Sequence, residues 1–361
     1  MTTNERIQEA LLAWYRKHAR DLPWRRTRDP YAIWLSEVML QQTRVDTVIP
    51  YFDRFLDELP TVEALADASE EKVISLWSGL GYYRRARMLH EGAKAIAKRP
   101  FPKTATALQE VRGIGRYTAG AVASIAFGEP APLVDGNVAR VLARLFGIED
   151  DLRKPKGMER IWSIAGTIVA MEDPGSWNQA LMELGATVCT PRAPRCLLCP
   201  LSKECKARKS GREQELPVMS AKRPPVLQRR VAIALSADNG DVALVRRAAS
   251  GIFAGMWEIP SIELANGEAH EAAAQRLGRF IGATCSGMAV RGEVVHVLTH
   301  RRLEVTVIGA ELTSRALRLS PDRAEYDDVA LMSRDEGAVR TKSTYGKKLM
   351  KMAFPSKTRG R

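Results

Sequence analysis

Four of the chain's five cysteines lie within one run of seventeen residues, CTPRAPRCLLCPLSKEC. The run places Cys189, Cys196, Cys199 and Cys205 in the spacing C-x6-C-x2-C-x5-C. Its other residues include proline, arginine and lysine, so inert core thiols are a poor explanation for it. In a reducing compartment, clustered thiols indicate a metal site rather than disulfides. The chain must therefore fold so that this short loop closes around a metal.

The spacing leaves two kinds of metal site open. Structural zinc usually uses two C-x2-C pairs, and this run contains only one, Cys196 with Cys199. The wider arms on either side suit a larger object held at its corners by thiolates, such as an iron–sulfur cubane. Spacing alone keeps zinc as the rival. Cys285 lies outside the run and is interpreted as a buried or neutral thiol.

The hydrophobic pattern changes along the chain, and 361 residues are too many for one ordinary core. Residues 1–206 carry apolar side chains at helical spacing, which predicts a compact all-α domain with a metal loop at 189–205. Residues 207–229 are polar and contain three prolines, which predicts a linker. Residues 230–354 combine alternating segments with one helical segment, which predicts an α+β domain. The last residues, 355–361, form a basic tail.

Positive charge gathers around the cysteine run. The chain has 55 Lys and Arg against 42 Asp and Glu, a formal charge of +13. Eleven basic and three acidic residues lie between Thr190 and Arg230, so this stretch contributes +8. Such a field favours a polyanion such as nucleic acid, although a solvated basic linker explains the part after Lys209 equally well. The polar N-terminus and the lack of a long apolar stretch predict a soluble, cytoplasmic protein with no membrane partner.

A glycine-containing turn between two predicted helices offers an anion site. Arg112-Gly113-Ile114-Gly115 precedes the helical segment RYTAGAVASIAFG. Glycines permit a tight turn and the close approach of another backbone. Unpaired N–H groups at the start of the second helix attract an anion, and such a hairpin can hold a DNA phosphate without reading sequence. An isolated G-x-G is more simply an ordinary helical hairpin.

Two carboxylates stand in unlike surroundings. Glu37 lies among apolar residues in IWLSEVML, and removal from water raises a carboxyl pKa, so Glu37 is expected to be protonated near neutral pH. A glutamate that reaches the helix surface is an equal alternative. Asp135 precedes a helix that begins near Gly136, where the helix dipole and amide hydrogen bonds keep a carboxylate ionised. Cleavage of a glycosidic bond needs such an acid and such an anion together.

These features occur together in one known family. The stretches LPWRRTRDPYAIWLSEVMLQQTRV, LWSGLGYYRRARMLH, GIGRYTAGAVASIAFG, VDGNVARVLARLF, NQALMELGATVCTPRAPRCLLCPL and GMWEIP resemble the MutY family. This family consists of adenine DNA glycosylases and belongs to the helix-hairpin-helix superfamily, with endonuclease III. The resemblance implies an all-α helix-hairpin-helix glycosylase domain with a 4Fe–4S cluster on the four cysteines, followed by an α+β Nudix-like domain. It also implies a monomer that excises adenine mispaired with 8-oxoguanine or guanine in double-stranded DNA.

The resemblance implies catalytic roles for four residues. Glu37 would protonate the flipped adenine and then activate water, and Asp135 would stabilise or attack the sugar cation. Tyr117 and Asn137 would support this pair. Lyase-type relatives carry a lysine where this chain has Tyr117, and a phenol cannot form an imine. The resemblance therefore implies a monofunctional enzyme that leaves an abasic site.

Further residues would contact the DNA. The residues that would line the base pocket are Trp24, Arg25 and Glu183. Those that would wedge into the duplex or hold its backbone are Gln42, Tyr82, Gly113, Gly115 and Arg116. In the second domain, Thr299 and His300 would recognise 8-oxoguanine, in a loop where Leu298-Thr299-His300 replaces the family's Phe-Ser-His. The segment EAHEAAAQRLGRFIG lacks the R-E-x-x-E-E pattern of Nudix hydrolases, so pyrophosphatase activity is not expected.

Two alternatives remain, and the second belongs to another class of protein. One is a related glycosylase that removes thymine or uracil from mismatches with guanine. The other is a non-catalytic DNA-binding protein stapled by zinc. The cysteine spacing by itself does not separate either alternative from an iron–sulfur adenine glycosylase.

Overall fold

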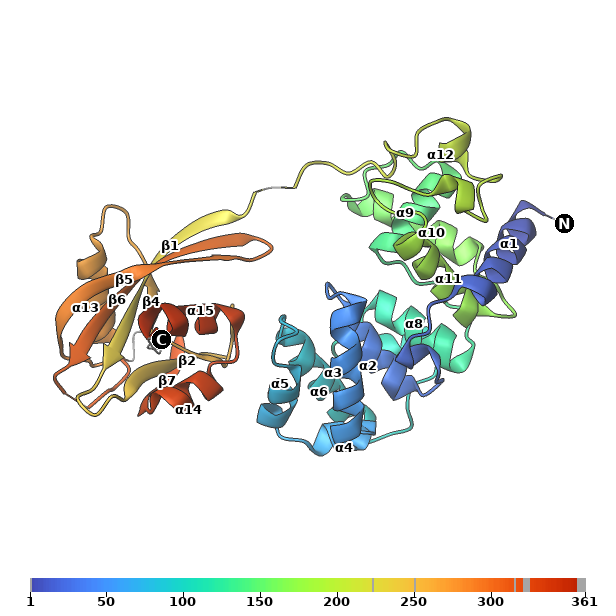
Figure 1. Ribbon diagram of the computed structural model, residues 1–361. Coiled ribbons are helices and arrows are strands. Elements are labelled where there is room, and N and C mark those ends of the chain that lie inside the picture. The colour runs from blue at the N-terminus through green and yellow to red at the C-terminus, as the bar shows by residue number, and fades with distance from the viewer. Residues whose placement is uncertain (1, 223, 250, 315, 321–324, 356–361) are drawn as a thin grey trace, which may run out of the picture. The chain divides into compact units, whose positions relative to one another are not determined.

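The computed structural model describes residues 2–222, 224–249, 251–314, 316–320 and 325–355. It divides into two compact units, Met1–Ala221 and Lys222–Arg361 (Figure 1). Most of the predicted basic tail, residues 356–361, lies outside the described residues. No helix among the described residues is long and apolar enough to cross a membrane.

The first unit is helical, as predicted (Figure 1). Local side chains explain where its helices begin. Asp29 accepts hydrogen bonds from the N–H groups of Tyr31 and Ala32, and Pro30 occupies the first helical position. The helices are α1 (Thr3–His18), α2 (Pro30–Leu40), α3 (Val45–Glu58), α4 (Val62–Asp67), α5 (Glu70–Trp77), α6 (Arg84–Ile96), α7 (Ala105–Gln109), α8 (Arg116–Phe127), α9 (Gly136–Phe146), α10 (Pro155–Thr167), α11 (Pro174–Thr187) and α12 (Lys206–Lys209), with 3-10 turns η1 (Pro23–Arg25) and η2 (Cys196–Leu198).

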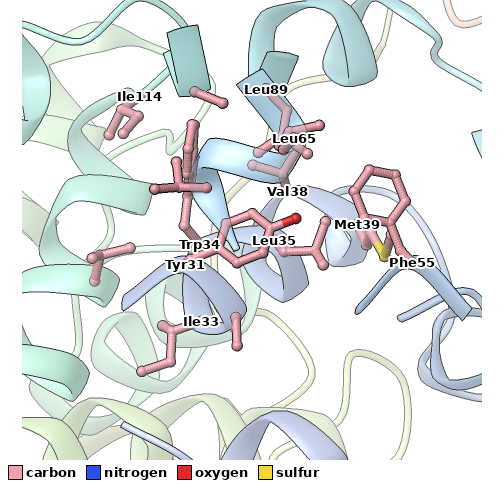
Figure 2. Close-up of a cluster of buried hydrophobic side chains, with 14 of the residues drawn as sticks. Tyr31, Ile33, Trp34, Leu35, Val38, Met39, Phe55, Leu65, Leu89 and Ile114 are labelled. Carbon is pink, nitrogen blue, oxygen red and sulfur yellow. The ribbon is translucent and has the colours of Figure 1, made fainter. Parts of the chain in front are cut away.

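Two hydrophobic cores fill the helical unit. The first surrounds α2 and is completed by residues of α3 to α8. Figure 2 shows Trp34, Leu35 and Met39 of α2 inside this core. The second core is formed mainly by α1, α9, α10 and α11. Every residue of α2 from Tyr31 to Met39 is buried, as expected for a helix that is apolar on all sides. Glu37 is therefore carried into the interior by its neighbours.

The segment after α12 packs on the helical unit. Leu216 is buried, and its carbonyl accepts a hydrogen bond from Nε of Arg144 at 2.8 Å. The N–H of Leu152 donates to the carbonyl of Val218 at 3.0 Å. The polar composition of residues 207–229 predicts a linker over their whole length, whereas in the structure the first part of this segment packs on the helical unit. That composition concealed these backbone contacts, and the boundary between the units falls after Ala221.

The second unit combines a mixed sheet with helices, in agreement with the predicted α+β class (Figure 1). Its main strand order is β3-β2-β1-β6-β5, with β4 paired to β1 and β7 paired to β2. Strands β1 and β6 are parallel, and the other pairs are antiparallel. The elements are β1 (Val226–Ser236), β2 (Val242–Arg247), β3 (Trp257–Glu258), β4 (Ser261–Glu263), α13 (His270–Phe280), β5 (Cys285–Val297), β6 (Arg301–Leu312), β7 (Tyr326–Met332), α14 (Arg334–Arg340) and α15 (Thr344–Ala353).

Both faces of this sheet are covered. Along β1, Val231 and Ile233 belong to the core on the α13 side, whereas Ala232 and Ala234 belong to the core on the α15 side. This alternation is the two-residue period of a strand with both faces buried. It explains why β1 is apolar without interruption over these positions.

Candidate active site

A cavity of about 470 Å³ lies at the seam between the two cores of the helical unit. One wall comes from η1, α2 and the loop that follows α2, and the other comes from α8, α9 and α11. The sequence-predicted residues that line it are Trp24, Arg25, Glu37, Gln42, Tyr117, Asp135, Asn137 and Glu183. Tyr82, Gly113, Gly115 and Arg116 are not among the lining residues. The fold thus gathers the predicted acid, anion and base-pocket residues into one site.

Glu37 is the buried acid of this site. The residue is only 4% exposed, and the Tyr117 hydroxyl donates a hydrogen bond to its Oε2. Burial raises the pKa of Glu37 to about 7, Tyr117 opposes the rise, and the neighbouring Asp135 adds to it. The Tyr117 oxygen also lies 3.3 Å from Sδ of Met182. Near neutral pH, Glu37 can therefore both give and accept a proton.

Asp135 caps the start of α9. Its Oδ1 accepts a hydrogen bond from the N–H of Val138 at 2.7 Å, and its Oδ2 accepts one from Nδ2 of Asn137 at 3.0 Å. Burial raises the pKa of Asp135 above its ordinary value, while these hydrogen bonds and Arg140 oppose the rise. The prediction of an ionised Asp135 rests on its N-cap position alone and leaves out this burial. The N-cap position limits a shift that burial drives upward.

The close approach of α11 to α9 depends on a missing side chain. A Cβ at Gly185 would lie 2.6 Å from Cβ of Asn137 and 3.0 Å from its carbonyl oxygen. Arg140 bridges the same helices, because its Nη2 donates to Oδ1 of Asn137 and to the carbonyl of Gly185, both at 2.8 Å. These contacts hold Asn137 against Asp135.

A fully buried carboxylate anchors two arginines at the rim of the cavity. Glu183 accepts hydrogen bonds from Nε of Arg20 at 2.7 Å and from Nη2 of Arg25 at 2.8 Å. Although burial alone would raise the pKa of Glu183, the two guanidinium groups hold it below its ordinary value. Arg25 also lies over the ring of Tyr15, 5.4 Å from its centroid. Glu183 is therefore a permanent anion that fixes Arg25, and it is not a second acid.

The predicted hairpin joins α7 to α8. Gly113 has a φ of +92°, which favours glycine, and a Cβ there would lie 2.9 Å from Cβ of Met88 in α6. Both the backbone conformation and the lack of space therefore require a glycine. Gly115 precedes α8 and would carry a Cβ into open space. No side chain caps the first turn of α8. The N–H groups there remain available to an anion.

Arg116 has other partners in this structure. Its Nη1 lies 3.0 Å from Oε2 of Glu159, and its guanidinium carbon lies 4.0 Å from the ring centroid of Trp162. These contacts tie the start of α8 to α10. Arg116 therefore positions the hairpin in the structure, and its predicted contact with DNA stays a prediction.

The four cysteines of the loop line one small hollow. No group of three or more His, Cys, Asp or Glu side chains in the described part of the chain is arranged to hold a metal ion. The donor set nevertheless fits a cluster with negative charge, because Nη1 of the buried Arg144 donates to Sγ of Cys189 at 3.3 Å. Arg144 also binds the carbonyls of Thr190 and Pro191, at 2.7 and 3.0 Å. Helix α9 thus carries Asp135 at its start and holds the cysteine loop further along.

In the second unit, Thr299 and His300 are exposed at the tip of the hairpin between β5 and β6. The N–H of Leu298 donates to the carbonyl of Arg301 at 2.7 Å, and the N–H of Val226 donates to the carbonyl of His300 at 3.0 Å. Leu298 is partly buried against the core on the α15 side. The backbone of the tip is therefore held firmly while two polar side chains point outward.

Several lining residues were missed by the sequence analysis. Gln179 and Met182 of α11 contribute to the cavity wall, and Arg20 pairs with Glu183. An amide such as that of Gln179 offers both a donor and an acceptor to a ligand. The positions three and four residues apart on α11 could have revealed this face.

Comparison with known proteins identifies the class. Residues 35–165 match the HhH-GPD superfamily of base excision DNA repair proteins, and residues 230–349 match the NUDIX domain. The solved structure of a thermostable thymine-DNA glycosylase aligns with a TM-score of 0.52 and 28% identity, over 57% of this chain and 97% of that one. The helical unit thus belongs to the HhH-GPD class of base excision DNA repair proteins.

Two curated relatives identify the family within this class. The human adenine DNA glycosylase is 38% identical over 362 residues, which are 84% of this chain and 66% of the human protein. The mouse adenine DNA glycosylase is 38% identical over 376 residues, 88% of this chain and 72% of the mouse protein. The chain belongs to the adenine DNA glycosylase family. It spans slightly less than two thirds of the human relative's length.

Proposed function

We propose that the protein removes adenine paired with 8-oxoguanine or guanine from duplex DNA, as the first step of base excision repair. The observation that carries the proposal is a protonatable buried acid, Glu37, that shares one cavity with the carboxylate Asp135. The names of the curated relatives support adenine as the base. The thymine or uracil mismatch glycosylase has support from one similar solved structure but from neither of these two curated relatives, and neither relative is named as a zinc-stapled binding protein.

The geometry suggests how the reaction proceeds. A glycosidic bond cannot be reached inside the stacked duplex, so the adenine must be flipped into the cavity. Glu37, with a pKa of about 7, protonates the departing base and then takes a proton from the attacking water. Asp135 provides negative charge for the cationic sugar. Tyr117 offers no amine to trap the sugar, so the product is an abasic site.

Contacts outside the cavity would hold the DNA. The uncapped first turn of α8, after Gly115, supports a phosphate contact. The four loop cysteines would hold a 4Fe–4S cluster, which supplies a rigid cross-link among them when bound. Arg144 then transmits that rigidity to α9. The exposed Thr299 and His300 would recognise 8-oxoguanine through hydrogen bonds.

The test is base release under single turnover from duplexes that carry adenine opposite 8-oxoguanine, adenine opposite guanine, or thymine opposite guanine. We expect release from the two adenine duplexes only. Glu37→Gln should lower the rate about 10³-fold, because an amide cannot donate the proton. Asp135→Asn should lower it by a similar factor, with duplex binding retained in both variants. Release of thymine, or full activity of either variant, would overturn the proposal.

The cluster has its own test. The purified protein should be brown and absorb near about 400 nm, as iron–sulfur proteins do. Replacing Cys199 with serine should remove this absorbance. A colourless protein that contains one zinc ion would show that the loop serves as a zinc staple.

A further inference from the structure

Two loops near the active site each hold a residue in a strained backbone conformation. Gln42, two residues after the end of α2, has a φ of +57°, and Tyr82, two residues before the start of α6, has a φ of +48°. Residues with a side chain rarely adopt the left-handed region, and they do so only where their surroundings force it. Gln42 reaches the cavity, and the Tyr82 side chain is 51% exposed. Something must hold both loops in place.

Arg85 of α6 is the group that contacts both loops. On the side of Gln42, its Nη1 donates to the carbonyls of Val38 and Met39, at 2.8 and 3.0 Å, and to that of Gln41. Its Nη2 donates to Oγ1 of Thr43 at 3.2 Å. These partners lie on either side of Gln42 in the chain.

The same guanidinium also holds the loop that carries Tyr82. Nη2 lies 3.4 Å from the carbonyl of Leu80 and 3.3 Å from that of Gly81. The guanidinium carbon lies 5.4 Å from the ring centroid of Trp77 and 5.3 Å from that of Tyr82. One side chain thus joins two loops that are about forty residues apart in the sequence.

The chemistry of arginine suits this task. A guanidinium presents five N–H donors in a rigid plane, whereas a lysine ammonium presents three donors on a flexible stem. Arg85 also places positive charge against the last carbonyls of α2, where the helix dipole is negative. Without the Arg85 guanidinium, the loops could relax from the left-handed conformations of Gln42 and Tyr82.

We propose that Arg85 is a positioning residue that fixes Gln42 and Tyr82 as one rigid unit for extrusion of the target base. The inference rests on the proposed function, since it concerns the same reaction. The resemblance implies that Gln42 and Tyr82 wedge into the duplex, and side chains that push a base out of the stack need a rigid support. Arg85 acts through the two loops and does not touch the reacting atoms.

The experiment compares two substrates that differ in the work of extrusion. In one, adenine pairs with 8-oxoguanine in a duplex; in the other, adenine faces an abasic-site analogue and has no partner. Arg85→Lys should slow single-turnover release from the paired substrate about tenfold or more and from the unpaired substrate about threefold or less. With 2-aminopurine in place of the target adenine, the fluorescence rise on binding should shrink. Arg84→Lys, a change at the exposed neighbouring position, is the matched control.

A milder variant guards against a folding defect. Thr43→Val removes one Arg85 acceptor from the first loop and should change the two rates in the same direction, to a smaller extent. Equal losses on both substrates would mean that Arg85 only supports the fold or the position of Glu37, and would overturn the inference. Unchanged rates and fluorescence in Arg85→Lys would overturn it as well. If the wild-type protein releases no adenine, the proposed function has failed, which is a separate result.

Discussion

Each of the two units buries a glutamate, and the two glutamates differ in what stands beside them. Glu37 in α2 is 4% exposed and receives a hydrogen bond from the neutral Tyr117 hydroxyl. Glu258 in β3 is completely buried and pairs with Nε and Nη2 of Arg247, both at 2.8 Å. Burial raises the pKa of Glu37, whose hydrogen-bond donor is neutral, whereas the hydrogen-bond donor to Glu258 is a cation.

The helical unit contains both arrangements. Glu183 is as deeply buried as Glu37, yet two guanidinium groups hold its pKa below the ordinary value. Arg25 bonds to Glu183 and only modestly lowers the pKa of Glu37. Arg20 and Arg25 thus pair with Glu183, and Glu37 remains able to carry a proton.

The strongest test of the comparison is Glu258→Gln. The change leaves the buried Arg247 guanidinium with the more distant Glu325, at 3.8 Å, as its anion, so we expect a loss of about 3 kcal/mol in the free energy of unfolding. Urea unfolding of the full chain measures this loss, and Glu293→Gln, at an exposed position on β5, is the control. A loss no larger than that of the control would show that the pair contributes nothing beyond packing.

The same substitution at Glu37 should have the opposite sign. The pKa of Glu37 is about 7 in the folded chain and near 4.5 when unfolded, so the wild type loses stability as pH rises between these values. Glutamine has no proton to lose. Glu37→Gln should therefore be more stable than the wild type by about 2 kcal/mol at pH 8, with no gain at pH 4. Urea unfolding of both proteins at pH 8 and pH 4 measures this difference in stability. An equal difference at the two pH values would contradict the prediction.

Tyr117→Phe should have the smallest of these effects. The Tyr117 hydroxyl opposes the rise in the pKa of Glu37, so its removal raises that pKa further. The protonated acid is present below its pKa and lost above it, so the alkaline limb of the pH–rate profile should move to higher pH. At pH 8 the variant should retain about two- to fivefold more of its own maximal rate than the wild type does of its maximum. A limb that moves to lower pH would show that Tyr117 donates its proton elsewhere.

Local sequence patterns predicted much of this molecule. The change from helical to alternating periodicity separated the two units. The apolar neighbours of Glu37 left burial and exposure as equal alternatives, and the structure shows burial. The position of Asp135 before a helix predicted its N-cap role, which the structure shows. These features depend on residues that lie close together in the chain.

Contacts between residues far apart in the chain could not be predicted from the sequence. Glu183 bonds to Arg20 across 163 positions, and Arg144 reaches Leu216 across 72. A polar residue looks the same in sequence whether it is solvated or forms such a contact. For this reason the packed part of the segment after residue 207 resembled a linker. The contacts of Arg85 with the two loops could not be predicted either.

The cavity lies where two separately packed halves of one unit meet, with Glu37 in the first half and Asp135 at the edge of the second. Because each half has its own core, we expect the contacts between the halves to loosen at a lower temperature than either interior. Because the acid and the anion must meet around one nucleoside, loosened contacts between the halves would stop catalysis before any helix unfolds. Heat inactivation should accordingly precede the loss of helical circular dichroism.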